Sequence, residues 1–184
     1  MQTIPINLTT ELAVPEIAPR WYALYTRANH ERRVSLELGD RGVHHYLPCY
    51  ESVRRWKDRR KLLKLPLFPG YVFVQIQLKD RLRALQTAGA VRLVGFNGGP
   101  TALPDDEIAA LREILGSGNK AEPFPYKSIG KRFCILRGPF AGLEGKLLRH
   151  RKKWRVVLSI DLIQRSVLVD MDAADLEIPA ARTA

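Results

Sequence analysis

Residues that could act as metal ligands, nucleophiles or general bases are few and scattered along this sequence. The two cysteines and four histidines are Cys49, Cys134, His30, His44, His45 and His150. Their spacing matches no metal-binding motif, and adjacent histidines in a strand would point to opposite faces. The acidic run Asp105–Glu107 is explained by the start of a helix, and no phosphate-binding glycine motif occurs. We therefore predict that the protein is not an enzyme and uses no metal and no cofactor.

A basic run with an aromatic residue inside it, RRWKDRRK (Arg54–Lys61), is the clearest chemical signal. Such a run predicts a contact with DNA, because arginine and lysine neutralise phosphates and an indole can stack on a base. A solvated hairpin tip is an equally good interpretation, since charged runs often only face water. The candidate nucleic-acid-binding residues are Arg54, Arg55, Trp56, Arg59 and Arg60 in this run, with Arg27, Arg32, Arg33 and Arg41 around the first predicted helix. A second basic run, Arg149–Arg155, is predicted to be a solubilising loop, with an RNA or ribosome contact as the second interpretation.

The composition also favours a polyanionic partner. The chain has 184 residues, and 30 lysines and arginines against 19 acids give it a formal net charge of +11. Its pI is near 10.0, which favours nucleic acid as a partner or environment. Two distant cysteines suit a reducing compartment. Because no signal-peptide pattern or long apolar run occurs, we expect a cytoplasmic monomer without a membrane partner, with a flexible tail over residues 1–19.

The pattern of residues 20–115 predicts an α+β domain of about four antiparallel strands and three helices. The expected strands are residues 20–26, 44–56, 61–78 and 91–96, of which the second and third form a hairpin around a charged turn. Three helices are expected. The first is capped by Asn29 and ends near Gly39, the second is capped by Asp80 and ends near Gly89, and the third begins after Pro104 and ends near Gly116.

The stretch PLFPGYVFVQI (Pro66–Ile76) has two apolar faces. Alternation places Val72, Val74 and Ile76 on one side of the expected strand, and Tyr71 and Phe73 on the other. A small domain has only one ordinary core, so the second face must contact something else. Two interpretations are open from the residues: the aromatic side chains support a helix on that face, or they form a docking surface for a partner.

Residues 116–128 contain glycine, serine and two prolines without periodicity, which predicts a linker. Residues 129–179 then show about five short strand-like segments and no convincing helix. This pattern predicts a small closed β-barrel. Its β-branched residues, among them Val156, Val157, Val167 and Val169, favour strands.

The segments RWYALYT, PLFPGYVFVQI and VRLVGF, followed after the linker by GPFAGLEG (Gly138–Gly145), resemble the NusG family of transcription elongation factors. The resemblance covers about residues 20–179. It implies an NGN domain over residues 20–115, a linker over 116–128 and a KOW β-barrel over 129–179. The residues matching the KOW turn are Gly138, Pro139, Phe140, Gly142 and Gly145. The C-terminal end differs from the strand expected of the housekeeping member, and the segment WKDRRKLLKLPLFPGY is more similar to the specialised paralogues of the RfaH and UpxY types.

The family resemblance also implies partners. It implies that the NGN domain binds the clamp helices of the largest RNA polymerase subunit through an aromatic patch, here Tyr25, Phe68, Tyr71, Phe73 and Phe96. It further implies a contact of the basic residues with upstream or non-template DNA, and recruitment of a ribosomal protein or a termination factor by the KOW domain. The implied function is suppression of pausing or termination. The alternative is an RNA-binding or ribosome-associated KOW protein, for which the positive charge would suffice.

Overall fold

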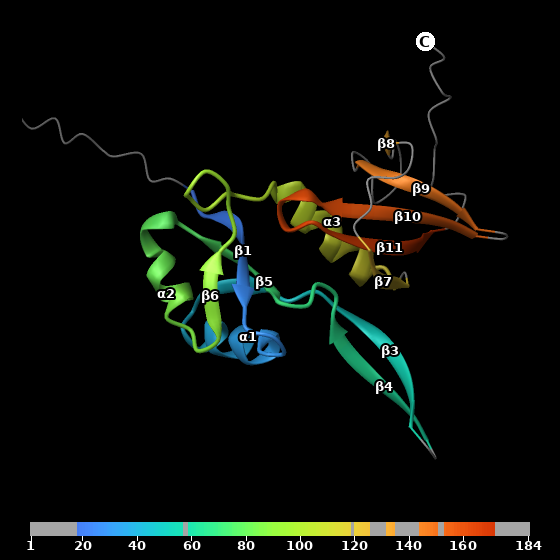
Figure 1. The fold of residues 1–184 in the computed structure, drawn as a ribbon, viewed down its shortest axis with the longest axis horizontal. Helices are drawn as coiled ribbons and strands as arrows, with labels where there is room; N and C mark the ends of the chain where they lie inside the picture. Colours follow the sequence, from blue (N-terminus) through green and yellow to red (C-terminus); the bar gives the residue numbers. More distant parts are fainter. Residues whose placement is uncertain are drawn as a thin grey trace, which may run out of the picture.

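The structure is a computed structural model that describes residues 18–56, 59–118, 120–125, 132–134, 144–150 and 153–171. For residues 54–56, 59–60, 132–134, 144–150, 153–154 and 171 the description covers the backbone only. The described chain forms a four-stranded sheet, a five-stranded sheet, a two-stranded hairpin and three α-helices (Figure 1). The predicted α+β class is therefore confirmed. No helix in these ranges is long and apolar enough to cross a membrane.

The N-terminal part is built on the four-stranded sheet, with the strand order β2-β5-β1-β6. Its strands are β1 (Arg20–Thr26), β2 (His44–Tyr46), β5 (Tyr71–Ile76) and β6 (Ala90–Leu93). β1 pairs antiparallel with β5 and places Tyr25 opposite Tyr71 and Ala23 opposite Phe73. Because paired residues point to the same side of a sheet, the sheet has the two apolar faces that the sequence predicts.

The first face is covered by α1 (Glu31–Asp40) and α2 (Arg81–Leu85), with a 3-10 turn, η1 (Leu78–Asp80), before α2. Val34 and Leu38 of α1 are fully buried against this face, as their four-residue spacing predicts. The predicted helix cap at Asn29 is wrong, because His30 is the N-cap residue and no side chain caps the helix. Asn29 instead adopts the left-handed conformation with φ 60°, which asparagine tolerates in turns.

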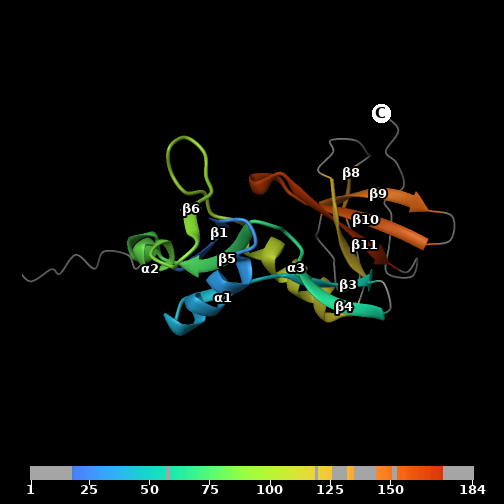
Figure 2. The same cartoon turned by 60° about the horizontal axis from the view of Figure 1, so that its bottom comes forward.

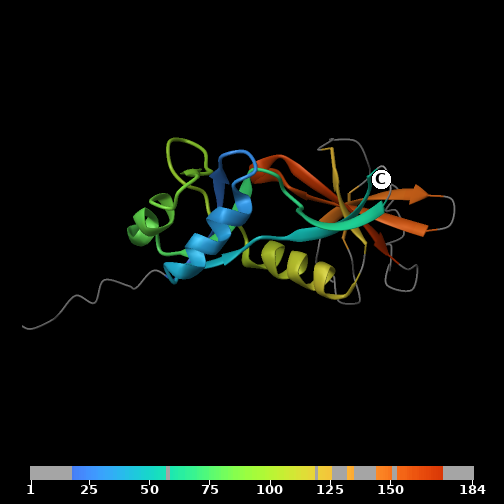
Figure 3. The same cartoon turned by 90° about the horizontal axis from the view of Figure 1, so that it is seen from below.

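The strands β3 (Cys49–Trp56) and β4 (Arg59–Pro66) form a hairpin that projects from the four-stranded sheet (Figures 1 and 3). The hairpin is as predicted, but the expected continuous strands 44–56 and 61–78 are each divided between the hairpin and the sheet. The divisions fall at Pro48 and at the segment 67–70, because proline has no N–H to give to a strand ladder. At the base of the hairpin, the Leu67 N–H donates to the Pro48 carbonyl oxygen at 2.8 Å.

The helix α3 (Asp105–Gly116) packs on the second face of the sheet. It begins directly after Pro104 and ends at Gly116, as predicted. Its buried side chains include Ile108 and Leu111, and the Arg112 guanidinium lies 4.8 Å from the centre of the Trp21 ring on β1. The helix therefore covers the Trp21 end of the second face.

The C-terminal part forms the five-stranded antiparallel sheet, with the strand order β7-β11-β10-β9-β8. Its elements are β7 (Ala121–Phe124), β8 (Arg132–Cys134), β9 (Glu144–His150), β10 (Lys153–Ile160), the 3-10 turn η2 (Asp161–Ile163) and β11 (Arg165–Met171). Val156, Val167 and Val169 are buried in these strands, so the strand prediction for them is confirmed.

One expectation for residues 116–128 is wrong. The sequence predicts no strand in this range, but β7 lies in it and pairs antiparallel with β11, with Ala121 opposite Val169. The strand AEPF has little local signal because its hydrogen bonds come from a partner far along the sequence, and its Pro123 suits an edge position. The barrel closure and the domain boundaries stay predictions, since residues 126–131 and 135–143 lie outside the described part.

The C-terminal sheet packs against the second face of the N-terminal sheet. A single cluster of buried side chains joins β1, β5, α3, β10, η2 and β11, and it includes Trp21, Ala23, Phe68, Phe73, Ile108, Leu111, Val156, Ile160, Ile163 and Val167. The turn between β10 and β11 extends toward the four-stranded sheet (Figure 2). The second apolar face is thus covered by α3 and by the C-terminal sheet together.

Candidate functional site

Four of the five aromatic residues expected to bind a partner lie in two ring pairs. The Tyr25 and Tyr71 rings, from opposed positions of β1 and β5, have their centroids 5.5 Å apart. The Phe68 and Phe73 rings meet edge to face at 5.7 Å, a favourable geometry for aromatic pairs. Phe96 lies in the loop after β6 and is 61% exposed. These five residues are called the aromatic set below.

The turn before β5 explains how Tyr71 comes to lie beside Tyr25. Gly70 has φ +86°, and a Cβ on it would lie 3.4 Å from the Tyr25 ring, so glycine suits both the conformation and the close approach. The Gly70 N–H donates to the buried Glu31 carboxylate at 2.7 Å, and its carbonyl accepts from the Thr26 N–H at 2.8 Å. The turn is therefore held by both β1 and α1, and it fixes the start of β5.

Burial divides the aromatic set. Phe68 and Phe73 are 1% and 0% exposed, whereas Tyr25 is 39% exposed and Tyr71 is half-buried. In this arrangement α3 and the C-terminal sheet cover the part of the face that holds Phe73. The role of all five residues in binding a partner stays a prediction.

Cations from three other elements lie over this side of the sheet. The Arg165 guanidinium of β11 is 5.9 Å from the Tyr71 ring centre, and that of Arg92 on β6 is 5.8 Å from the Tyr25 ring centre. Arg112 of α3 lies over Trp21 and also over the Tyr46 ring, at 5.0 Å from the latter. Sequence reasoning missed these contacts, because each arginine is far along the chain from the ring it covers.

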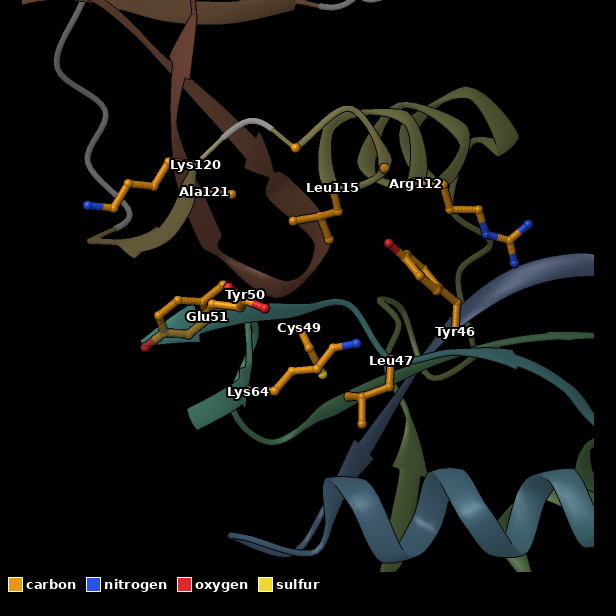
Figure 4. A pocket seen from close by; sticks show the side chains of 12 residues that line it. Tyr46, Leu47, Cys49, Tyr50, Glu51, Lys64, Arg112, Leu115, Lys120 and Ala121 are labelled. Carbon is orange, nitrogen blue, oxygen red and sulfur yellow. The ribbon is translucent and has the colours of Figure 1, made fainter. Parts of the chain in front are cut away.

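A pocket of about 700 Å³ lies between the base of the hairpin, the end of α3 and the start of β7 (Figure 4). Its walls include Tyr46, Tyr50 and Leu115, and Lys64 brings a positive charge. Burial raises the pKa of Tyr46 to about 12, so its phenol stays protonated at neutral pH. Burial also raises the pKa of the Cys49 thiol, which makes that thiol a poor nucleophile. The pocket thus offers ring faces and hydrogen-bond donors but no activated nucleophile.

The basic residues around α1 differ in their surroundings. Arg27, Arg32 and Arg33 are exposed. Arg41 donates to the Glu37 carboxylate at 2.9 Å and to the Gln86 carbonyl oxygen at 3.2 Å, so it links α1 to the segment after α2. The hydrogen bond from Arg41 is the main cause of the lowered pKa of Glu37. Arg41 therefore has a structural role in addition to its predicted nucleic-acid role. The nucleic-acid role stays a prediction for all these arginines.

Backbone pairing shows where the hairpin arginines lie. Arg55 pairs with Arg60 and Trp56 with Arg59 across the end of β3 and β4, and Arg54 pairs with Lys61. The pairing gathers the predicted DNA-binding residues at one end of the hairpin.

Of the expected KOW turn, Gly145 lies in β9 opposite Phe133 of β8. Gly138, Pro139, Phe140 and Gly142 lie outside the described residues. Among the residues that the structure describes, no group of His, Cys, Asp or Glu side chains could hold a metal ion.

Comparison with known proteins agrees with this architecture. The family model described as transcription termination factor NusG matches residues 19–112. The transcription termination/antitermination protein NusG of Pseudomonas aeruginosa is 27% identical over 176 residues, covering 88% of this chain and 99% of that protein. The protein of the same name from Thermus thermophilus is 27% identical over 173 residues, covering 83% and 94%.

A solved structure described as domain interaction in Thermotoga maritima NusG shares the fold, with a TM-score of 0.56 at 20% identity over 88% of this chain and 98% of that one. The family match spans just over half of the chain and contains the whole four-stranded sheet, the hairpin and most of α3. The chain therefore belongs to the NusG family of transcription termination and antitermination factors.

Proposed function

We propose that this protein binds RNA polymerase during elongation and suppresses pausing or termination. The aromatic set on the second face of the N-terminal sheet would dock on the clamp helices of the largest polymerase subunit. The observation that carries the proposal is an apolar, aromatic sheet face that the N-terminal part covers with its own helix α3 only in part, at the Trp21 end. Of the aromatic set, Tyr25 on this face and Phe96 in the loop after β6 are exposed, and rings that become buried at an interface are common anchors of affinity.

The C-terminal sheet gives this docking face a second state. In the arrangement described, Arg165 and the buried residues of η2 and β11 cover Tyr71 and Phe73. Full docking of the clamp helices therefore requires the C-terminal sheet to move away, and we call the two states closed and open. A domain interaction is also described for Thermotoga maritima NusG, and this supports the occurrence of such a contact in a related fold.

Two further contacts complete the proposal. The arginines at the end of the hairpin and the exposed arginines of α1 would bind upstream or non-template DNA, where they neutralise phosphates. Once released, the C-terminal domain would recruit a second protein, either a ribosomal protein or a termination factor. The protein performs no chemistry in this scheme, and its docking energy holds the polymerase clamp closed.

A pull-down from nuclease-treated lysate tests the proposal against the alternative of an RNA-binding or ribosome-associated protein. The tagged full chain should retain RNA polymerase after all RNA and DNA are digested, because the docking face contacts protein. A chain with Tyr25→Ala and Phe96→Ala should lose polymerase, whereas a chain with Leu36→Ala and Leu82→Ala, two exposed apolar residues of α1 and α2, should keep it. If digestion removes every partner, or leaves only ribosomal proteins, the alternative is correct.

A further inference from the structure

One oxygen atom of a half-buried carboxyl group, Oε2 of Glu107, is buried without a partner where α3 meets the C-terminal sheet. The Oε2 atom of Glu107 is inaccessible to solvent and has no hydrogen-bond partner within the described structure. Glu107 lies in the first turn of α3, next to the buried Ile108. Most buried polar groups are hydrogen-bonded, and each exception calls for an explanation. An ionised carboxylate in this place would bear a large desolvation cost.

The charges that act on Glu107 are negative. They belong to Asp106 on the same helix and to Asp161 in η2 of the C-terminal part. Ile160 and Ile163, which flank Asp161 along the chain, share one buried cluster with Ile108. Asp161 is therefore brought toward Glu107 by the packing of the C-terminal sheet on α3, and a separated C-terminal sheet would take its charge away.

We propose that closure of the C-terminal sheet over the aromatic set is coupled to the uptake of one proton by Glu107. The neutral carboxyl group then lies between α3 and η2 without repelling Asp161, whereas an ionised Glu107 favours separation. The inference rests on the closed and open states of the proposed function, and it adds that pH shifts the equilibrium between these two states. Acidification would hide the docking face, and alkaline conditions would uncover it.

The direction of the effect follows from proton linkage. Burial first, and then the charges of Asp106 and Asp161, raise the pKa of Glu107 from its usual 4.5 to about 7. Between these two values the closed state binds one more proton than an open state in which the carboxyl is solvated, so closure becomes more favourable as pH falls through 7. The effect is complete below the ordinary pKa, and it vanishes above the raised one, where both states are ionised.

Energy transfer between two dyes measures closure in the full chain without any polymerase. A cysteine-free background, Cys49→Ser with Cys134→Ser, carries one dye at Leu36→Cys on α1 and one at Lys146→Cys on β9. The closed-to-open ratio should rise when the pH is lowered from about 8.5 to about 5.5. The rise is at most about 30-fold if closure causes the whole increase in the pKa of Glu107, and several-fold if closure causes only part of that increase. The polymerase pull-down is a separate measurement, so either proposal can fail without the other.

Matched variants separate the contribution of Glu107 from that of other groups. Glu107→Gln, a neutral residue of the same shape, should raise the closed fraction at high pH and abolish its pH dependence. Asp161→Asn should move the midpoint to lower pH. Glu113→Gln, which removes an exposed acid of the same helix, should behave as the wild type. A wild-type ratio that changes less than about twofold over this range, or a pH dependence that persists in folded Glu107→Gln, would overturn the proposal.

Discussion

Tyr25 and Phe73 lie on the same face of one sheet but have different physical roles. Phe73 is fully buried beneath α3 and the C-terminal sheet, whereas Tyr25 keeps 39% of its surface exposed at the edge of the contact. Truncation of a buried ring removes its transfer free energy and leaves a cavity, while truncation of a partly exposed ring at an edge does so to a smaller extent. The same aromatic set therefore contains residues that stabilise the fold and residues that are free to bind.

A pair of single variants tests this division. Phe73→Ala should lower the free energy of unfolding by about 3 to 5 kcal/mol, as ring truncations in cores do. Tyr25→Ala should lower the free energy of unfolding by less than about 1 kcal/mol, because the Tyr25 ring lies at a partly solvated surface. Urea denaturation followed by circular dichroism measures both values. Equal losses for the two variants would mean that the division by burial is wrong.

At this scale the sequence predicts which face a residue takes but not what covers it. Strict alternation from Tyr71 to Ile76 is a local property, so the two faces of β5 are readable from the residues. The burial of Phe73 depends on η2 and β11, nearly a hundred residues away, and no periodicity records that contact. The interpretation of the second face as core therefore holds for the part around Phe73, and the interpretation as a docking surface stays a prediction.

The hairpin of β3 and β4 is the element whose proposed function depends most on charge. Its cross-strand pairing sets Arg55 opposite Arg60 at the projecting end. Like charges opposite each other are unfavourable in a free hairpin, and a bound phosphate would relieve this repulsion.

A double substitution at this pair tests the DNA contact. Arg55→Ser with Arg60→Ser should weaken binding to an elongation complex most at low salt. It should also reduce the slope of log affinity against log salt by about 2, because two fewer phosphates are neutralised. Titration at several salt concentrations gives this slope. The control of equal charge is Lys79→Ser with Arg81→Ser, which removes two exposed cations before and at the start of α2. If the hairpin variant and the control variant give the same salt slope, the hairpin end does not bind DNA and is only a solvated tip.

Elements with strong local signals are predicted well. The helix α3 combines a preceding proline, acids in its first turn, inward apolar spacing and a final glycine, and its bounds agree with the structure. The strand β7 has none of these signals and exists through its pairing with β11. The divided strands at Pro48 and at residues 67–70 show a third case, in which the prolines are visible in the sequence but the change of sheet is not.

At the scale of the whole molecule, the order of the elements predicts where a protease cuts first. Residues 116–128 connect α3 to the rest of the C-terminal sheet, but 121–124 are hydrogen-bonded in β7. Limited digestion with subtilisin, read by mass spectrometry, should therefore cut this range outside β7 and yield two protected pieces. A first cut within residues 20–115, or within β7 itself, would contradict the division into two domains.

The contact between the two sheets is the feature that sequence reasoning could least supply. Each sheet is consistent with its own local pattern, whereas their association depends on side chains from β1, β5, α3, η2 and β11 together. Interfaces between domains of one chain resemble transient protein interfaces, and relative motion is their default. In the proposed function, the same property would let a polymerase compete for the covered face.

The affinity of the full chain for purified RNA polymerase tests the central claim most directly. Relative to the wild type, Tyr25→Ala with Phe96→Ala should weaken binding by about 30-fold or more, because truncation of even one aromatic anchor often costs about 2 kcal/mol. Its melting temperature should fall far less than that of Phe73→Ala, since Phe96 is 61% exposed and Tyr25 is 39% exposed whereas Phe73 is fully buried. The control variant, Leu36→Ala with Leu82→Ala, should bind as the wild type does. If all three chains bind polymerase with equal affinity, the aromatic set is not the docking surface.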